Sequence, residues 1–460
     1  MNPKTLTEGS IFSHMLSLSL PLMLGNLLQQ FYNTIDAFVL GRFTGTEAFA
    51  AIGIASSIMN LFLFAVTGAC TGLSVLFSQF YGAREMGRFR QEHYLTLCAG
   101  LPLSMGLGGI GILCLPKLLA VIQTPASLTA PVKDYLILVL AALPASYLYN
   151  LYSALLRSIG RADVSLVALA GAVGVNLFLD ILLVSHGYGI FGAALSTAIA
   201  QVFSFLLCLG YLRWKQPETV FRRSDRKLDR ALLKKSGHFA FVAGLHQSSL
   251  YIGKLIVQGA VNTGGTELIT AYTATTRLEG FANSFGDSGA AATSVITAQN
   301  LGAQKYDRVQ KTFRVSLWFL LLLGLFCSVV MYTTSNLAVS FLMETDDGNA
   351  LHSAQQYMRW IALFYPLCFT GNTFAGYFDG CGKVSIPFCG AVTHISLRAI
   401  LSWIFVGRYG LNAVAIATGI GWVLVNLIWT ICYFRQKETL SSQVSPTLPG
   451  ERPGSCGSSN

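Results

Sequence analysis

Long apolar runs separated by short polar loops occupy almost the whole chain. A helix that crosses the hydrocarbon of a bilayer needs about 20 apolar residues, and each run reaches this length. The pattern therefore predicts an all-α membrane protein with twelve membrane-spanning helices. The predicted spans cover approximately residues 11–40, 48–80, 93–114, 134–156, 163–184, 190–212, 238–261, 268–300, 314–335, 356–378, 386–406 and 411–434.

The apolar pattern contains an internal repeat with a period of about 220 residues. Gly45-Thr46-Glu47 recurs as Gly265-Thr266-Glu267, and residues 74–83 recur as residues 294–303, each with the motif Gln-x-x-Gly-Ala. Each copy holds six spans, an even number, so the two copies have the same orientation. We therefore expect two parallel six-helix lobes related by a pseudo-two-fold axis along the membrane normal. Such duplications are typical of secondary transporters, which bind substrate between their repeats.

The composition agrees with a membrane protein. Hydrophobic residues make up 53% of the chain and charged residues only 11%, whereas soluble domains carry about 25% charged residues. The net charge of +10 does not indicate nucleic-acid binding, because the basic residues lie in short loops between apolar spans. The ten cysteines include no Cys-x-x-Cys pair, so we expect no structural metal site. The first apolar run is too long for a cleaved signal and is expected to remain as a span.

The distribution of basic residues orients the spans. Lys and Arg are concentrated in the two tails and the even-numbered loops, whereas the odd-numbered loops contain few. By the positive-inside rule, this bias predicts a multi-pass protein of the cell (plasma or inner) membrane with both termini in the cytoplasm. The predicted domains are an N-lobe (1–212), a basic cytoplasmic linker (213–237), a C-lobe (238–435) and a disordered tail (436–460) rich in Ser, Pro and Gly.

Several motifs resemble those of the multidrug and toxic compound extrusion (MATE) transporters. They are Pro21, Asn33-Thr34-Ile35-Asp36 followed by Gly41-Arg42, the duplicated Gln-x-x-Gly-Ala, the segment 156–161 with its counterpart 378–383, and Asn176-x-x-x-Asp180. The resemblance covers residues 10–435, because the motifs occur in order across twelve spans. It implies two six-helix lobes around a central cleft, and export of bulky, often cationic compounds against an inward flow of H⁺ or Na⁺.

The first predicted lobe contains two acidic residues within its spans, Asp36 and Asp180. Each lies five residues before the outer end of its span, so the two carboxyls have similar depth. Asn33 and Asn176 lie one turn below them, and Thr197 falls at about the depth of Asn176. An ionised carboxylate inside a bilayer costs about 2.5–3.5 kcal/mol on insertion scales, which favours a functional role.

These five side chains are the candidate cation-coupling site. Their oxygen atoms could hold a proton or a Na⁺ ion, the latter at Asp36, Asp180 and Asn176. In related MATE transporters the positions that match Asp36, Asn176, Asp180 and Thr197 belong to such a network. The structural alternatives are that Asp36 caps a helix end and that Asp180 pairs with an arginine.

The second predicted lobe carries its acids elsewhere. At the repeat offset, the two acids of the first lobe fall on apolar residues, whereas Glu279 and Asp287 lie eight residues apart in the eighth span, roughly on one face. They could attract a cationic substrate, or Lys254, Arg277 or Arg398 could neutralise them.

Three further residues are candidates for the substrate cleft. They are Gln29, Tyr32 and Tyr147. The two tyrosines could contact a cationic compound through their ring faces. The alternative is that they face lipid or the core, as most aromatic residues of such helices do.

We therefore predict a cation-coupled multidrug antiporter that works by alternating access, with H⁺ favoured over Na⁺, and not an enzyme. The expected partners are small-molecule drugs and membrane lipid but not nucleic acid, with no cofactor beyond the coupling ion and a monomer as the functional unit. Two alternatives remain. A flippase for lipid-linked precursors would share the architecture but is expected to have a basic cleft and two more spans. A membrane-embedded enzyme would need a His-Asp or Ser-His pair near an interface, and the sequence offers no convincing one.

Overall fold

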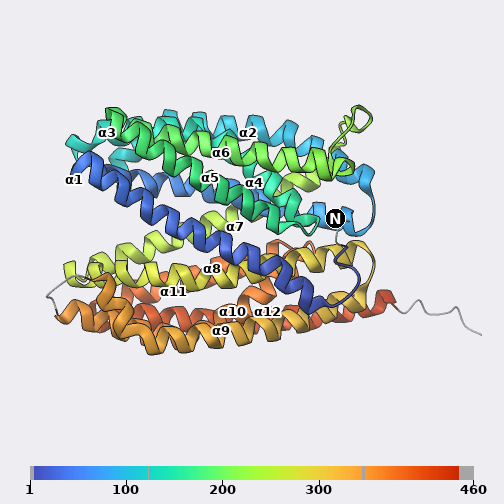
Figure 1. Ribbon diagram of the computed structural model, residues 1–460. Helices are drawn as coiled ribbons and strands as arrows, with labels where there is room; N and C mark the ends of the chain where they lie inside the picture. Colours follow the sequence, from blue (N-terminus) through green and yellow to red (C-terminus); the bar gives the residue numbers. More distant parts are fainter. Residues whose placement is uncertain (1–4, 123, 344–347, 445–460) are drawn as a thin grey trace, which may run out of the picture.

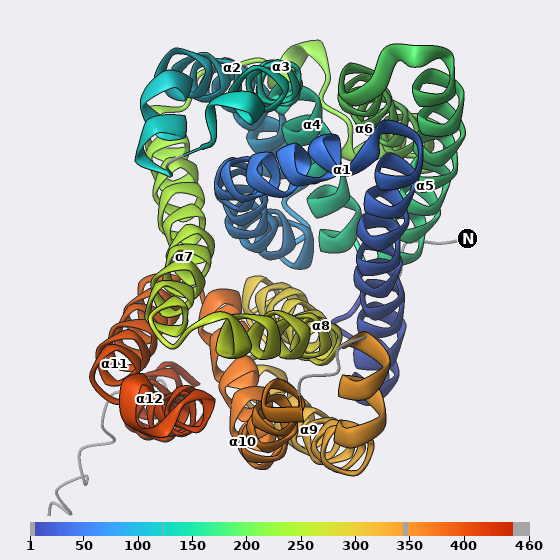
Figure 2. The same cartoon turned by 90° about the vertical axis from the view of Figure 1, so that its left-hand side faces the viewer.

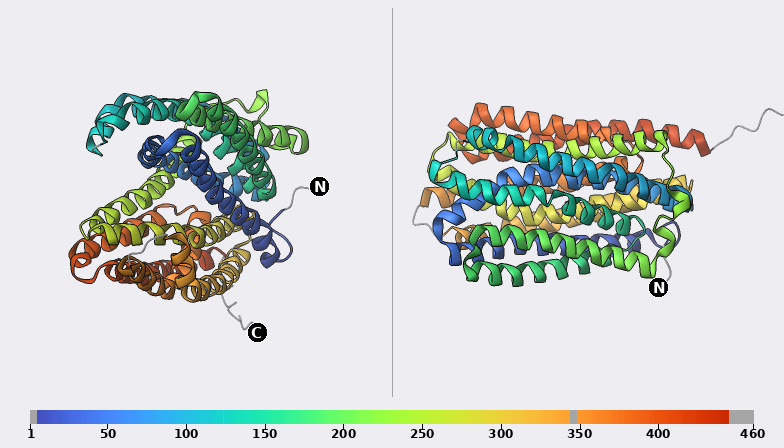
Figure 3. Two further views of the ribbon diagram at one scale, coloured as in Figure 1. Left: turned by 60° about the vertical axis from the view of Figure 1, so that its left-hand side comes forward. Right: turned by 90° about the horizontal axis from the view of Figure 1, so that it is seen from above.

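The computed structural model describes residues 5–122, 124–343 and 348–444, and the side chains within them except those of residues 32–50, 121 and 439–444. Its helices form two bundles, one above the other in Figure 1, and run in one general direction (Figure 3, right). The helices are α1 (Ile11–Gly82), α2 (Met86–Val121), α3 (Ala126–Ala141), α4 (Leu143–Ser158), α5 (Ala162–Leu183), α6 (Gly189–Lys215), α7 (Arg230–Asn262), α8 (Thr266–Gly302), α9 (Tyr306–Leu342), α10 (Gly348–Gly380), α11 (Ser385–Tyr409) and α12 (Leu411–Val444). Three short helical turns lie between them: η1 (Val184–Tyr188), η2 (Pro217–Thr219) and η3 (Arg223–Asp225).

Helix α1 contains the first two predicted spans. Its 72 residues would extend about 108 Å if straight, at 1.5 Å per residue, which is more than three times the thickness of the hydrocarbon. Figure 2 shows instead that the early part runs along one edge of the molecule and the later part lies inside the upper bundle. Two apolar stretches within it, Ile11–Phe31 and Ala51–Gly82, each have the length and hydropathy of a membrane span.

The fourth predicted span is broken rather than continuous. It consists of α3 and α4, which meet at an angle of 45° around Ala142. Pro144 stands in the first turn of α4, and a proline lacks the amide hydrogen that would continue the preceding helix. The prediction of a single helix over 134–156 is therefore wrong in this detail, although both pieces belong to one crossing.

Hydropathy alone detects only some of the crossings. Within the described part of the chain, seven helical stretches pass a test of length and hydropathy, or eight with the bent pair α3–α4. One of the seven, Ala162–Lys215, holds both α5 and α6. Helices α7, α8 and α10 are absent from that set because they carry more polar residues, and α8 packs against α1, α9 and α10 rather than facing only lipid.

Each bundle buries a hydrophobic core, and the N-lobe core continues across the lobe boundary to Phe239 of α7 and Ala298 of α8. In the N-lobe, Leu76 and Phe77 of α1 are buried with Leu151 and Leu155 of α4. In the C-lobe, the core is built around the aromatic side chains of α10 and their neighbours on α8 and α12. Large hydrophobic side chains on the outer faces of both bundles are exposed in the isolated chain, as expected of surfaces that contact lipid.

The linker between the lobes is shorter than predicted. Helix α6 continues to Lys215, and α7 begins at Arg230 after Asp229, whose side chain accepts the amide hydrogens of the first turn. Residues 230–237 therefore belong to α7. Arg90 of α2 donates from Nε to Asp225 Oδ2 over 2.8 Å, which fastens the linker to the N-lobe.

The end of the chain also differs from the prediction. Disorder was expected from residue 436, but α12 continues to Val444. Residues 445–460 lie outside the described part of the chain.

The duplicated motifs form a pair of equivalent contacts between the lobes. Gln79 Nε2 donates to the carbonyl oxygen of Gly380 over 3.3 Å, and Gln299 Nε2 donates to the carbonyl oxygen of Ser158 over 2.6 Å. The two glutamines occupy equivalent positions of the repeat, as do the two acceptors. Each lobe therefore holds the other with the same hydrogen bond, and we call these four residues the inter-lobe latch.

Two glycines allow the helices to approach at the latch. A Cβ atom on Gly82 would collide with the backbone of Gln299, and one on Gly302 would collide with the backbone of Gln79. These glycines are the fourth residues of the two Gln-x-x-Gly-Ala motifs. The motif therefore combines a glutamine that reaches across the interface with a glycine that lets the partner backbone come close.

The segment before α1 reinforces one half of the latch. Leu6 is fully buried, and its amide donates to Gln299 Oε1 over 3.1 Å. Asn300 Nδ2 donates to the carbonyl oxygen of Leu6 over 3.4 Å, and Lys305 Nζ donates to that of Thr7 over 3.1 Å. Because Leu6 and Thr7 bond to Gln299 and Lys305, the latch lies beside the N-terminus, at the end of the molecule that also carries the linker (Figure 1). This is the side predicted to be cytoplasmic.

We expect Gly302→Ala to loosen the latch. The added methyl must displace the backbone of Gln79, and overpacking of this kind costs about 1–3 kcal/mol. Hydrogen–deuterium exchange followed by mass spectrometry should show faster amide exchange in residues 76–83 and 296–303. The matched control is Gly109→Ala on α2, where a Cβ would meet no other group within 4 Å. Equal exchange in both variants would show that the close approach is not needed.

Candidate functional site

The candidate site of the N-lobe is built on the hairpin of α5 and α6. The chain reverses at η1, where Gly187 has a φ of 88° and Gly189 a φ of 49°. Both values lie in the left-handed region that glycine adopts without steric cost. Because the two helices run antiparallel from this turn, residues equally distant from it face each other. Asp180 and Ser196 are such a pair, at equal distance from Tyr188.

A buried hydrogen-bond network joins four side chains of this hairpin. Asp180 and Asn176 are 0% and 1% exposed. Ser196 Oγ donates to Asp180 Oδ1. Asn176 Nδ2 donates to Ser196 Oγ over 3.2 Å and to Thr197 Oγ1 over 3.3 Å. The structure therefore brings together Asp180, Asn176 and Thr197, three of the five predicted coupling residues.

Ser196 was not singled out from the sequence. Its position opposite Asp180 follows from the register of the hairpin, which requires the site of the turn to be known. Gly187 and Gly189 gave that signal, because closely spaced glycines after an apolar run indicate a reversal. The remaining predicted residues of this group, Asn33 and Asp36, and the predicted cleft residue Tyr32 have side chains outside the described part of the structure.

The chemistry of the N-lobe site follows from burial. A charge in a medium of low polarity is costly unless a partner of opposite charge or hydrogen-bond donors compensate it. Asp180 receives the Ser196 hydroxyl, and none of the other three side chains of the network carries a charge. A carboxylate in this setting gains from binding a proton or a small cation.

A second polar cluster lies in the C-lobe around Glu279 of α8. Glu279 is 8% exposed, and its Oε1 accepts the hydroxyl of Tyr357 over 2.7 Å. The hydroxyl of Tyr365 lies 3.3 Å from Asn283 Oδ1 and 3.4 Å from the carbonyl oxygen of Glu279. Two tyrosines of α10 therefore fix the carboxyl-bearing segment of α8.

The basic residues considered as partners of Glu279 act on it without forming an ion pair. Arg398 and Lys254 are near enough to influence Glu279 electrostatically. However, Arg398 Nη2 donates to the hydroxyl of Tyr272 over 3.2 Å, and the salt bridges found among the described residues do not include Glu279. The direct partner of Glu279 is thus Tyr357.

Asp287, the second acid of α8, has a different environment. It is exposed, although it lies near the middle of a helix that packs against three others. Thr273 and Thr276 are exposed on the same side of α8, at the spacing of one helical face. Asp287 therefore faces accessible space, whereas Glu279 is enclosed.

Comparison with known proteins identifies the family of the chain. The family model described as MatE matches residues 21–182 and again residues 243–404, which together exceed half of the chain. The chain belongs to the MatE family. The two matches lie at equivalent positions of the internal repeat, so the duplication recognised in the sequence is a duplication of the MatE domain itself.

Two curated relatives from Bacillus subtilis (strain 168) match most of this MatE protein. It is 26% identical over 368 residues to the probable multidrug resistance protein YoeA, covering 78% of this chain and 80% of that protein. It is also 26% identical over 364 residues to the probable multidrug resistance protein YpnP, again covering 78% and 80%. The multidrug export protein MepA of Staphylococcus haemolyticus (strain JCSC1435) is 24% identical over 278 residues, or 60% of this chain and 61% of MepA.

Solved structures confirm the fold of this MatE protein. An outward-facing multidrug resistance MATE family transporter of the MOP superfamily superimposes with a TM-score of 0.89 at 19% identity, covering 96% of this chain and 99% of that one. A MOP superfamily transporter from Pyrococcus furiosus Vc1 (DSM3638) gives the same TM-score, identity and coverage. These structures confirm the prediction of twelve spans in two lobes, and the family match confirms the prediction of a transporter rather than an enzyme.

The structure of this MatE protein places the two remaining candidates for the substrate cleft, Gln29 and Tyr147, in different environments. Gln29 is half-buried on the early part of α1, near the residues of that helix that contact α8, such as Asn26, whose Nδ2 donates to Ser288 Oγ over 3.1 Å. Tyr147 is only 5% exposed, and its hydroxyl donates to the carbonyl oxygen of Thr96 over 2.7 Å. The placement of Tyr147 in the cleft is therefore corrected: its ring and hydroxyl belong to the core between α2 and α4.

We expect Tyr357→Phe to destabilise the C-lobe. The substitution leaves the buried Oε1 of Glu279 without its direct donor, which costs about 1–3 kcal/mol. Thermal unfolding of the purified protein should show a lower Tm than the wild type. The control is Tyr332→Phe on α9, whose side chain is 47% exposed and should leave the Tm unchanged. A Tm for Tyr357→Phe equal to that of the control would mean that the contact contributes nothing.

Proposed function

We propose that this MatE protein exports structurally varied small molecules across the cell membrane in exchange for an inward-moving cation. The observation that carries the proposal is the network around Asp180, a fully buried carboxyl held by Ser196 and linked to Asn176 and Thr197. The names of the relatives support the substrate class, because YoeA and YpnP are described as probable multidrug resistance proteins and MepA as a multidrug export protein.

The network around Asp180 is the proposed site of coupling, and Asp36 and Asn33, whose side chains lie outside the described part of the structure, are proposed as its further members. The cation binds from outside, neutralises the buried carboxyl, and allows the substrate to leave. On the inner side the cation is lost and substrate enters from the cytoplasm. Because both events use one site in turn, cation entry is tied to substrate exit.

A proton suits the described residues better than Na⁺. Sodium requires several oxygen ligands, but Asn176 directs its NH₂ group, not its oxygen, toward the hydroxyls of Ser196 and Thr197. The hydroxyl of Ser196 is also used in its bond to Asp180. These hydrogen bonds form without a metal ion, and a proton on Asp180 would not disturb them. We therefore propose H⁺ as the coupling ion.

The latch explains how the inner side is kept closed in the present conformation. Its two inter-lobe hydrogen bonds and the close backbone approach at Gly82 and Gly302 leave no room between the helix ends. Opening to the cytoplasm requires both bonds to break. Since the N-terminus and the linker lie at the same end, we place that end in the cytoplasm.

Asp287 is the proposed point of attraction for cationic substrates. It is an exposed acid on α8, in the lobe that lacks the coupling network. Lys254 is near enough to act on it electrostatically, which limits but does not remove its attraction for a cation. The lipid-facing outer surface suits a monomer surrounded by membrane lipid.

We expect Asp180→Asn to abolish cation-driven transport in the folded protein. The amide is nearly the same size but cannot accept a proton, so the driving gradient is no longer coupled to substrate movement. The measurement is substrate flux in proteoliposomes, first with an imposed pH gradient and then with a Na⁺ gradient.

The matched control for Asp180→Asn is Asp134→Asn, because Asp134 is exposed on α3, and it should transport normally. Flux at the wild-type rate in Asp180→Asn would refute the coupling role of the network. Flux driven only by the Na⁺ gradient in the wild type would reverse the choice of ion. Asp36→Asn is expected to behave like Asp180→Asn.

We expect Asp287→Asn to weaken binding of a cationic substrate but not of a neutral analogue of similar size. Loss of the carboxylate removes an attraction that only the cation experiences. Equilibrium binding of both compounds to detergent-purified protein measures the difference. Asp307→Asn, an exposed acid at the start of α9, is the control. Equal weakening for both compounds would assign Asp287 a structural role instead.

A further inference from the structure

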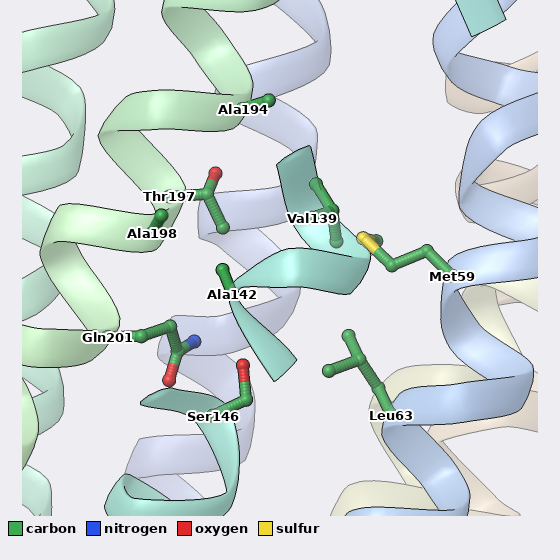
Figure 4. A pocket seen from close by; sticks show the side chains of 9 residues that line it. All are labelled: Met59, Leu63, Val139, Ala142, Ser146, Ala194, Thr197, Ala198 and Gln201. Carbon is green, nitrogen blue, oxygen red and sulfur yellow. The ribbon is translucent and has the colours of Figure 1, made fainter. Parts of the chain in front are cut away.

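A small cavity lies beside the coupling network inside the N-lobe (Figure 4). Its volume is about 30 Å³. It is enclosed by the later part of α1, the junction of α3 and α4, and α6. The lining residues are Met59, Leu63, Val139, Ala142, Ser146, Ala194, Thr197, Ala198 and Gln201.

The cavity exists because the fourth crossing is broken. Ala142 lies at the break between α3 and α4 and lines the cavity. The 45° bend follows from Pro144, which cannot continue the hydrogen bonding of α3. A straight helix would pack its side chains continuously against α1 and α6, whereas the bend leaves space beside Ala142.

Three polar side chains reach this otherwise apolar cavity. Figure 4 shows Gln201 and Ser146 on the same side of the cavity, with the hydroxyl of Ser146 and the amide nitrogen of Gln201 toward the other lining residues, and Thr197 further along. Gln201 Oε1 is buried, and no described residue donates a hydrogen bond to it. A buried carbonyl oxygen without a donor costs about 1–3 kcal/mol, so a water that hydrogen-bonds to this amide would be stabilising.

The size and polarity of the cavity select its occupant. A water molecule needs about 10–15 Å³ of such volume and two to four polar partners, so the cavity has space for one or two waters. Drug-sized ligands need about 300 Å³ or more and do not fit. The absence of charge among the nine lining residues also disfavours a bare metal cation.

The cavity adjoins the coupling network through Thr197. Thr197 accepts a hydrogen bond from Asn176 and also lines the cavity. Gln201 follows Thr197 by one helical turn, so the two side chains lie on one face of α6. At 1.5 Å per residue, Gln201 is about 18 Å from Gly189 at the end of α6, more than halfway through hydrocarbon about 30 Å thick.

We propose that this cavity is a water site that extends the Asp180 network inward and relays the coupling proton, with Gln201 as the residue that positions the water. The inference rests on the proposed function. The proton leaves the carboxyl of Asp180 by way of the hydroxyls of Ser196 and Thr197, reaches this water, and passes to water on the cytoplasmic side once that side opens. Gln201 neither gains nor loses a proton; its amide holds the relaying water by a hydrogen bond.

Two substitutions test the relay in different ways. Gln201→Leu keeps the bulk of the side chain but removes the amide, and Ala142→Leu fills the cavity while leaving every polar group in place. In proteoliposomes, substrate-triggered proton flux measured with an enclosed pH-sensitive dye should fall about tenfold in each, the effect of roughly one lost hydrogen bond. Substrate Kd should stay unchanged. The control is Gln258→Leu on α7, because the Gln258 amide donates to Asn262 Oδ1 over 2.8 Å at an exposed position.

Hydroxyl-radical footprinting gives a readout that does not depend on transport. Met59 lines the cavity, and radiolysis of a water held there should oxidise its sulfur. Mass spectrometry should detect the sulfoxide of Met59 in the wild type and severalfold less in Ala142→Leu. If Gln201→Leu fails to fold, this measurement still tests whether the cavity holds water.

The outcomes separate the relay from the proposed function. Wild-type proton flux in both cavity variants, or an unoxidised Met59 in the wild type, overturns the relay. If Asp180→Asn is inactive in the same assay, the antiporter proposal stands without it. If Asp180→Asn also transports normally, the proposed coupling site itself is wrong. Slow flux in both variants with unchanged Kd and a protected Met59 in Ala142→Leu supports the relay.

Discussion

A polar group inside the hydrocarbon of a bilayer must find its partner within the protein, because lipid offers none. This constraint makes the described secondary structure helical, since a helix satisfies its own backbone. It also decides which side chains can be tolerated inside the spans. Asp180 is tolerated in the membrane because Ser196 donates a hydrogen bond to it and Asn176 in turn donates to Ser196. Glu279 is tolerated because the hydroxyl of Tyr357 on α10 donates to it. Gln201 carries one of several buried polar atoms to which no described residue provides a partner, and its position at the cavity points to water.

The two copies of the MatE domain keep their shared contacts and differ in their buried polar groups. The latch is common to both, because Gln79 and Gln299 use the same hydrogen bond from opposite sides. Elsewhere the copies diverge. Glu279 occupies the position in the second copy that Met59 occupies in the first. At this position the C-lobe has a carboxyl held by tyrosines, whereas the N-lobe has a methionine that lines a small cavity. The scaffold needs symmetry to let the lobes meet, whereas the proposed coupling site belongs to one lobe only.

Periodicity and duplication were enough to predict the number of crossings, the pairing of the lobes and the grouping of Asp180, Asn176 and Thr197, because each depends on spacing along one or two helices. Features that depend on contacts between distant segments were not accessible in the same way. Ser196 became visible only with the register of the α5–α6 hairpin, and Tyr147 was misplaced because an aromatic residue in a span can face core or cleft with the same spacing. Pro144 in the sequence indicates a break in the fourth crossing, but a hydropathy window averages the hydropathy over both sides of the proline and does not detect it.

The latch and the N-lobe site are connected by the helices that carry both. Helix α4 begins beside the cavity with Ser146 and ends at Ser158, the acceptor of Gln299. The later part of α1 likewise passes from Met59 at the cavity to Gln79 at the latch. A helix is stiff over this distance, so a change in the α3–α4 bend that accompanies a change at the cavity would move the acceptor of Gln299 as well. Proton occupancy on one side of the N-lobe and closure at its other end can therefore be linked by two rigid elements, without any rearrangement of the lobe cores.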